Sequence, residues 1–154
     1  MKPGAFTQLY THLIFAVKHR ECLLVKEIRD EVFSYIAGII INRKSKPIII
    51  NGVSDHVHIL IGLNPDDKIS DLVGNIKKDS SLFINEKRLL NGYFHWQDGY
   101  GAFSYGKSQI NNVYNYIANQ EKHHSESTFH DEYVSLLKRY EIAFNDKYLF
   151  DFFN

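Results

Sequence analysis

The chain has 154 residues, of which 44% are hydrophobic and 23% are charged, so its composition is that of one ordinary globular domain. The 18 basic residues balance the 18 acidic ones, which argues against an indiscriminate nucleic-acid binder, since such proteins carry a basic excess. No apolar run is long enough to cross a bilayer, no signal-peptide cleavage site follows the N-terminus, and Cys22 is the single cysteine. We therefore expect one cytoplasmic domain over residues 1–154, without disulfides or a cysteine-rich zinc site.

The first half of the chain predicts a strand, a helix and a hairpin. Residues Gln8–Lys18 alternate between two largely apolar sets of side chains, which is typical of a central strand. Residues Lys26–Asn42 carry apolar side chains at helical spacing and predict a helix. Pro47–Val53 and His56–Leu63 predict two strands that are joined by a tight turn.

The second half adds one strand and three helices. A helix is expected over Lys68–Leu90, and a strand interrupted by glycines is expected over Phe94–Tyr105. Ser108 can cap a third helix that runs through His124, and Thr128–Tyr140 predicts a last helix. The order βαββαβ followed by two helices predicts an α+β fold, ferredoxin-like or RRM-like, with a four-stranded antiparallel sheet and helices on one face.

The stretch DHVHIL contains two histidines, His56 and His58, at alternate positions of a predicted strand. Side chains of a strand point to opposite faces with period two, so both imidazoles share one face and Val57 lies on the other. Two imidazoles in this arrangement can supply neighbouring ligands to one metal ion. The spacing alone is a weak signal, because eight histidines in the chain make a chance pair common. A hydrogen-bonded pair at the sheet surface is the other interpretation.

A metal site needs at least one more protein ligand. Cys22, Asp55, Gln120 and the remaining histidines are candidates. Tyr116 and Gln120 are four residues apart on the predicted third helix and therefore share one helical face, which His123 continues. Considered singly, Tyr116 also fits a half-buried packing residue, and Gln120 also fits a surface residue.

Four segments of the chain resemble the single-tyrosine transposases of the HUH superfamily, which mobilise insertion sequences as single-stranded DNA, and their REP-associated relatives. The segments are YTHLIFAVKHR (Tyr10–Arg20), NGVSDHVHILIGL (Asn51–Leu63), ISDLVGNIKKDSS (Ile69–Ser81) and HWQDGYGAFSYGKSQINNVYNYIANQEKHH (His95–His124). The resemblance covers nearly the whole chain, and the combination is far more specific than any one segment.

The resemblance implies a role for each member of the pattern. It implies that His56 and His58 bind a divalent metal, Mg²⁺ or Mn²⁺, and that Gln120 completes the metal site. It implies that Tyr116 is the nucleophile, while Tyr114 is a second choice because it lacks the four-residue relation to Gln120. The implied reaction is cleavage and rejoining of single-stranded DNA through a 5′-phosphotyrosine intermediate.

The resemblance also implies partners. They are single-stranded DNA with hairpin ends and a second copy of the chain, in a homodimer whose active sites are shared between subunits. Bases can stack on exposed aromatic side chains while basic side chains track the phosphates. The predicted phosphate contacts are Arg43, Lys44, Lys77 and Lys78.

Three other functions remain open on the sequence. A non-catalytic module that binds single-stranded nucleic acid would keep every measurable activity after Tyr116→Phe. A metal-dependent hydrolase, in which water attacks, would show turnover without a covalent adduct. A purely structural dimer would show no metal dependence.

Overall fold

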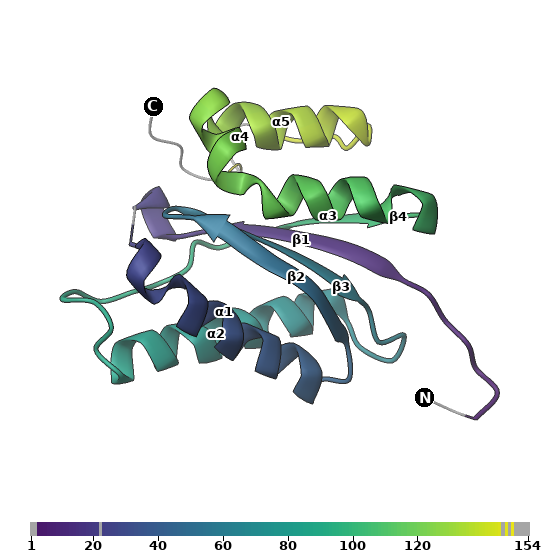
Figure 1. Cartoon of the computed structure of the whole chain (residues 1–154), viewed down its shortest axis with the longest axis horizontal. Helices are drawn as coiled ribbons and strands as arrows, with labels where there is room; N and C mark the ends of the chain where they lie inside the picture. The colour runs from purple at the N-terminus through teal and green to yellow at the C-terminus, as the bar shows by residue number, and fades with distance from the viewer. Residues whose placement is uncertain (1–2, 22, 146, 148, 150–154) are drawn as a thin grey trace.

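Four strands form one antiparallel sheet, and helices cover both of its faces (Figure 1). The structure, a computed structural model, describes residues 3–21, 23–145, 147 and 149. The strands are β1 (Tyr10–Ala16), β2 (Lys46–Val53), β3 (His56–Gly62) and β4 (Gly101–Tyr105). Their order across the sheet is β2-β3-β1-β4, so the predicted four-stranded ferredoxin-like arrangement is confirmed.

The central strands β1 and β3 determine which side chains share a face of the sheet. Ile14 lies opposite His58, and Ala16 lies opposite His56. Residues directly opposite one another in an antiparallel pair project from the same face. The two histidines therefore share their face with Ile14 and Ala16, while Phe15 projects from the other face into the main core.

Helices α1 (Lys26–Asn42) and α2 (Ile69–Glu86) cover the face from which Phe15 projects. α1 has the predicted bounds, because its apolar residues recur at helical spacing and build one buried stripe. α2 ends four residues before the predicted Leu90. The reason is local, since Arg88 adopts a left-handed conformation with φ of 53° that a right-handed helix cannot continue through.

A second helical layer covers the opposite face of the sheet (Figure 1). Its helices are α3 (Ile110–Ala118), α4 (Gln120–Glu126) and α5 (Phe129–Arg139). α3 packs on the sheet through Val113 and Ile117, which form a small cluster with Leu60 of β3. This layer therefore lies over the face that carries the two histidines of β3, whereas α1 and α2 lie behind it.

The fourth strand is shorter than the sequence predicts. β4 begins at Gly101 instead of Phe94, and Trp96 adds one isolated bridge to Val17. Part of the backbone between them is held by a side chain, because the Lys77 ammonium donates to the carbonyls of residues 97 and 99 at 2.7 and 2.6 Å. Carbonyls bound in this way take no part in a strand ladder.

The predicted helix from Ser108 to His124 is divided in two. A short 3₁₀ helix, η2 (Lys107–Gln109), precedes α3, so Ser108 lies inside that turn and its side chain forms no cap. α3 ends at Ala118, and Asn119 separates it from α4 with φ of −102° and ψ of 29°. Its side-chain amide donates to the Asn115 carbonyl at 2.8 Å. The same carbonyl also accepts the Asn119 backbone amide at 3.1 Å, so both bonds close the last turn of α3.

The last helix was predicted correctly to within one residue at each end. Thr128 is its N-cap, and the Thr128 hydroxyl accepts a hydrogen bond from the Asp131 amide at 3.1 Å.

The first strand is shorter than predicted. β1 ends at Ala16 and is soon followed by the short 3₁₀ helix η1 (Lys18–Arg20). No helix in the described ranges is both long and apolar enough to span a membrane.

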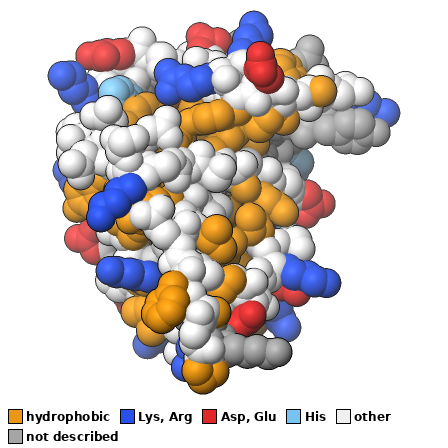
Figure 2. Space-filling model, turned by 90° about the vertical axis from the view of Figure 1, so that its right-hand side faces the viewer, with side chains coloured by type: hydrophobic (Ala, Val, Ile, Leu, Met, Phe, Trp, Pro, Cys, Tyr) orange, Lys and Arg blue, Asp and Glu red, His pale blue; other side chains and the backbone are white. Residues whose placement is uncertain are grey.

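The surface agrees with the balanced composition. The face drawn in Figure 2 shows basic and acidic side chains scattered among hydrophobic ones, and neither sign of charge dominates that face. This face therefore carries no continuous surface of one charge that could attract a polyanion by itself.

Candidate metal and nucleophile site

The two histidines of β3 are buried beneath the α3–α5 layer, with 1% of His56 and none of His58 exposed. Val57, between them, is buried in the main core on the other side of the sheet. The alternation predicted from the spacing is therefore present. Both imidazoles lie inside the protein and not at an open sheet surface, which removes the interpretation as a surface pair.

Each imidazole is held through its Nδ1 atom by a second polar side chain. The Asp55 carboxylate accepts a hydrogen bond from His56 Nδ1 at 2.7 Å. His58 Nδ1 is hydrogen-bonded to His12 Nε2 at 2.8 Å, and His12 Nδ1 lies 3.2 Å from the Tyr105 hydroxyl. Such outer partners fix the orientation of a ring and direct its other nitrogen, Nε2, towards a ligand.

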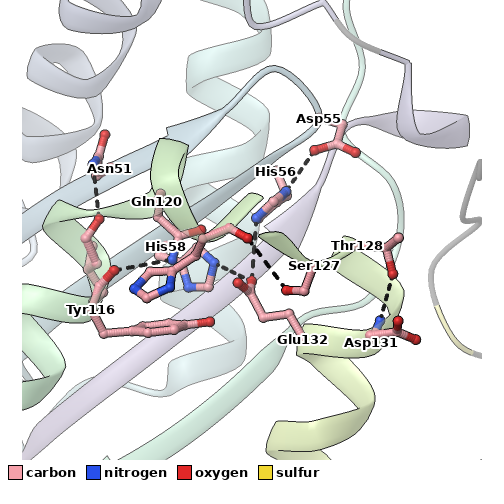
Figure 3. A network of polar contacts seen from close by, with 12 residues as sticks. Asn51, Asp55, His56, His58, Tyr116, Gln120, Ser127, Thr128, Asp131 and Glu132 are labelled. Carbon is pink, nitrogen blue, oxygen red and sulfur yellow. Dashed lines mark hydrogen bonds and ion pairs between the residues drawn. The ribbon is translucent and has the colours of Figure 1, made fainter. Parts of the chain in front are cut away.

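Glu132 of α5 reaches the Nε2 atoms of both histidines (Figure 3). Its Oε1 atom lies 3.0 Å from His58 Nε2 and 3.6 Å from His56 Nε2. One ligand atom from each of these three residues falls within 4.8 Å of the others, so the group could hold a metal ion. An ion with nitrogen and oxygen ligands and no thiolate fits the chemistry of a hard or intermediate divalent metal.

Tyr116 and Gln120 lie beside this cluster (Figure 3). The Tyr116 ring meets the His58 ring edge to face, with centroids 5.8 Å apart, and packs against His123 at 4.7 Å. Gln120 is fully buried at the start of α4. Its Nε2 lies 3.5 Å from the Tyr116 carbonyl. The structure therefore brings together all four residues singled out in the sequence, although Tyr116 and Gln120 belong to successive helices.

Two of the atoms predicted to bind metal have unsatisfied hydrogen-bonding capacity. Three buried side-chain polar atoms lack a hydrogen-bond partner within the described part of the chain, and two of them are His56 Nε2 and Gln120 Oε1. A buried polar atom without a partner is costly and calls for an explanation, such as an ion or ordered water. The residues present thus fit a divalent ion bound between β3 and α4.

The charges of the cluster follow from burial and from contacts within it. Burial lowers the pKa of His58. At His56 burial also acts to lower the pKa, but the Asp55 and Glu132 carboxylates together outweigh it and the pKa is raised. Burial opposes the charge on Glu132, but the two imidazoles hold the pKa of its carboxyl well below the ordinary value. Burial, and then the charge of Glu132, raise the pKa of Tyr116. At neutral pH the site therefore contains an ionised carboxylate and a neutral phenol.

A cavity of about 630 Å³ opens beside the cluster. Side chains of α3, α4 and α5 line it, among them Tyr116, His123, Glu132 and Arg139. Its volume is in the range of pockets that bind small ligands, and it gives the Tyr116 side chain access to space outside the core. A group in this cavity can thus reach both the Tyr116 side chain and the Glu132 carboxylate.

The predicted phosphate contacts lie in the α1–α2 layer, on the other side of the sheet. Arg43 makes two hydrogen bonds to Asp67, at 2.6 and 2.9 Å, and Lys77 is bound to backbone carbonyls above the Phe15 ring. Lys44 and Lys78 are exposed. The contact of these four basic residues with DNA stays a prediction.

Other candidates also lie outside the cluster. The side chain of Tyr114, the second choice as nucleophile, is exposed and does not line the cavity. Cys22, one candidate third ligand, lies outside the described residues. Asp55 contacts His56 through Nδ1, so it supports that ring from behind and does not face the shared Nε2 side.

Sequence reasoning missed Glu132, and it included His12 only among the remaining histidines that could bind the metal. Glu132 is 74 residues from His58 in the chain, and no spacing rule joins a helix residue to a strand at that separation. His12 gave a weak signal, since it is a titratable side chain inside an otherwise apolar strand. The strand alternation places it on the same face as His58 only when the pairing of β1 with β3 is known.

The four-stranded antiparallel sheet, its histidine–hydrophobe–histidine strand and the tyrosine beside it agree with the resemblance to the single-tyrosine HUH transposases. Residues 5–120 match the model of the IS200-like transposases. The match covers most of the chain, and the chain belongs to this family. The protein is therefore a transposase.

Individual relatives agree with this assignment. The ISDra2 transposase TnpA of Deinococcus radiodurans is 29% identical over 122 residues, which are 76% of this chain and 87% of the relative. The transposase for insertion sequence element IS200 of Salmonella typhimurium is 27% identical over 115 residues, covering 71% and 74% of the two chains.

Solved structures agree with the fold. A crystal structure assigned as a transposase from Deinococcus radiodurans R1 superposes with a TM-score of 0.62 at 26% identity and covers 78% of this chain and 96% of that one. A REP-associated tyrosine transposase bound to a REP hairpin gives a TM-score of 0.59 at 16% identity, with 80% and 74% covered. The second similarity concerns the fold alone.

Proposed function

We propose that this transposase cleaves and rejoins single-stranded DNA by transesterification, with Tyr116 as its nucleophile. His56, His58 and Gln120 are the proposed ligands of a divalent ion. The observation that carries the proposal is the position of the Tyr116 ring against His58, at the cavity. The ring lies next to buried ligand atoms that have no hydrogen-bond partner among the described residues. This arrangement provides a nucleophile and a binding site for positive charge at one point.

The reaction exchanges one phosphate ester for another. The Tyr116 oxygen forms a bond to phosphorus, and the bond from phosphorus to the 3′ oxygen of the preceding nucleotide breaks. The phenol loses its proton, and the departing oxygen gains one and becomes a free 3′-hydroxyl. The energy of the ester is retained in the 5′-phosphotyrosine link, so a DNA 3′-hydroxyl can reverse the step at a new junction without ATP.

Before metal and DNA bind, the surroundings of Tyr116 disfavour its ionised form. A free phenol has a pKa near 10, and burial together with the Glu132 carboxylate raises the pKa of Tyr116 further. When bound, a divalent ion supplies positive charge to the phosphate oxygens and to the charge that develops in the reaction. The surrounding residues hold the phenol in place and keep water away from it on the sheet side.

Mg²⁺ or Mn²⁺ is the proposed ion. Imidazole nitrogens and an amide oxygen suit Mn²⁺, and Mg²⁺ accepts such a mixed set less readily. Neither histidine carries a charge when it binds a metal through Nε2, so these ligands leave the positive charge of the ion available to the phosphate. Asp55 and His12 hold the two rings from behind.

Single-stranded DNA with a hairpin is the proposed partner, supported by family membership and by the REP hairpin on the structural neighbour. A homodimer with shared active sites is also proposed from the resemblance. The single chain by itself contains a complete set of the proposed residues, because Tyr116 lies beside His58 of its own sheet. A shared site thus requires α3 to leave this position.

The proposal is tested by trapping the covalent intermediate. Single-stranded oligonucleotides from the hairpin-containing flanks of the element are labelled at the 3′ end, because the adduct retains the downstream fragment. They are incubated with protein and Mn²⁺ and separated on a denaturing gel. We expect a protein–DNA band with the wild type and with Tyr114→Phe, and none with Tyr116→Phe.

Other outcomes separate the competing functions. Cleaved DNA without a covalent band would support a hydrolase in which water attacks. Hairpin binding without cleavage, unchanged in Tyr116→Phe, would support a non-catalytic module. His56→Ala is expected to lose cleavage and retain hairpin binding.

A further inference from the structure

We propose that Glu132 is a further protein ligand of the metal ion, contributed by α5. This helix follows the segment that matches the family model, which ends at residue 120. The inference rests on the proposed metal site of His56, His58 and Gln120 and adds an anionic ligand to it. It changes the donor set from neutral imidazole and amide groups alone to the same groups with one carboxylate.

The separations of the ligand atoms carry the inference. Neighbouring ligands that bind one ion at about 2.0–2.2 Å in tetrahedral or octahedral sites are about 2.8–3.6 Å apart. Glu132 Oε1 lies 3.0 Å from His58 Nε2 and 3.6 Å from His56 Nε2. The carboxylate oxygen is thus at the distance from both nitrogens that a shared ion requires. The contact to His56 is too long for a hydrogen bond.

The position of Glu132 is fixed by its neighbours on α5. Phe129 stacks on the His56 ring with centroids 3.8 Å apart and planes 1° apart. Tyr133 packs into the space beside Gly101, where an added Cβ would lie 2.8 Å from the Tyr133 hydroxyl. Both aromatic residues are buried. Glu132 therefore lies between anchors of the helix, and its carboxylate is delivered to the histidines by packing and not by an exposed, mobile side chain.

The donor set has a chemical consequence. Two imidazoles and one carboxylate form a combination that binds divalent metals and leaves open positions for other ligands. The carboxylate neutralises one positive charge of the ion, so it favours tighter binding and leaves less charge for the phosphate. Gln120 Oε1, which has no hydrogen-bond partner among the described residues, remains available on the α4 side of the same cluster.

The same contacts allow an opposite role, in which Glu132 occupies the metal position as an ion-pair partner of the histidines. The two roles predict opposite effects of removing the charge. A ligand stabilises the bound ion, so Glu132→Gln weakens binding. A competitor must leave before the ion enters, so Glu132→Gln strengthens binding.

The test is a titration of the full-length protein with Mn²⁺, followed by the signal of free Mn²⁺ in electron paramagnetic resonance and by calorimetry. We expect Glu132→Gln to weaken Mn²⁺ binding by about 10-fold or more, and Glu132→Asp to fall between it and the wild type. Asp131→Asn is the matched control, because its carboxylate is adjacent in sequence and 72% exposed. It is expected to bind as the wild type does.

Each outcome has a distinct meaning. Equal or tighter Mn²⁺ binding by Glu132→Gln overturns the role of Glu132 as a ligand and leaves the proposed histidine site intact. If the wild type shows no specific Mn²⁺ binding, and His58→Ala gives the same titration curve, the metal site and this inference are overturned together. Circular dichroism and the melting temperature without metal show whether a variant is folded. If Glu132→Gln is unfolded, Glu132→Asp decides by the same measurement.

Discussion

The imidazole of His12 on β1 is hydrogen-bonded to that of His58 on β3, with 2.8 Å between Nε2 and Nδ1. Both residues are fully buried. His12 is linked in turn to the Tyr105 hydroxyl on β4 at 3.2 Å. Three adjacent strands thus contribute one polar chain that ends at a proposed metal ligand. Its effect on the site is to fix the plane of the His58 ring.

His12→Leu is expected to weaken Mn²⁺ binding by about 10- to 100-fold, because loss of an outer partner frees the ligand ring. His12→Gln keeps a side-chain oxygen that can accept from His58 Nδ1, and it is expected to recover part of the loss. The measurement is Mn²⁺ affinity together with formation of the covalent adduct. His95→Gln, an exposed histidine, is the control. Wild-type Mn²⁺ affinity in His12→Leu would remove this role.

Gly52 is required by the backbone of the β2–β3 hairpin. A Cβ at this position would lie 2.3 Å from the carbonyl oxygen of His56, and neither group can move without disturbing the ladder. Gly52→Ala is expected to destabilise the protein by about 2–4 kcal/mol in chemical denaturation. Gly38 provides the opposite control, since no atom lies within 4 Å of an added Cβ. There alanine should stabilise α1 by about 0.5–1 kcal/mol. Equal effects of the two substitutions would contradict the steric argument.

The alternation of side chains along β3 and the bounds of α1 could both be predicted from the sequence. Alternation along His56–Val57–His58 depends only on the period of a strand, and the α1 bounds depend only on a local apolar stripe. Both are local rules, so they are independent of the rest of the fold. The resemblance to transposases supplied the chemistry that these local rules leave open.

Features that depend on tertiary contacts could not be predicted. The start of β4 depends on the Lys77 ammonium, which binds backbone carbonyls across a separation of about 20 residues. Glu132 enters the cluster only because α5 folds back over the sheet. In each case the deciding contact joins residues that no periodicity relates.

Lys77 predicts a specific dependence of stability on pH. Burial lowers the pKa of its ammonium to about 8 from an ordinary 10.5. Between these values the unfolded chain binds more protons than the folded one, so stability rises as the pH increases from 8 towards 10.5. After allowance for partial solvent exposure we expect a gain of about 1–2 kcal/mol.

Chemical denaturation at pH 7.5, 8.5 and 9.5 measures the effect. Lys77→Met should lose the rise in stability relative to the wild type, and Lys78→Met, at the exposed neighbour, should retain it. The series stops below pH 10 because ionisation of tyrosines in the unfolded chain then opposes folding. A rise that persists unchanged in Lys77→Met would show that another group is responsible.

Arg139 lies at the same cavity as Tyr116 and is expected to contact a DNA phosphate. Arg139→Gln should weaken binding of a hairpin oligonucleotide and reduce the slope of log affinity against log salt by about 0.7–0.9. Fluorescence anisotropy at several salt concentrations measures both quantities. Lys78→Gln removes the same charge from the other side of the sheet. An equal loss in Lys78→Gln would favour the phosphate contacts predicted from the sequence on the α1–α2 layer.

Mixing two inactive variants distinguishes a site within one chain from a shared one. In the single chain Tyr116 packs against its own His58, whereas the proposed homodimer shares its active sites between subunits. His58→Ala and Tyr116→Phe should each fail to form the covalent adduct. The proposed shared site predicts that their mixture regains it, and a mixture that stays inactive would favour a site within one chain. In a dimer that exchanges α3, two subunits, one of each variant, together form one intact site. After mixing, half of the dimers contain one subunit of each variant, and each of these has one intact site out of two. Adduct would therefore reappear at up to about a quarter of the wild-type amount. Size-exclusion chromatography before and after mixing, with and without DNA, shows whether subunits associate and exchange. Recovery of adduct on the Tyr-containing chain would require α3 to leave the position it occupies beside His58.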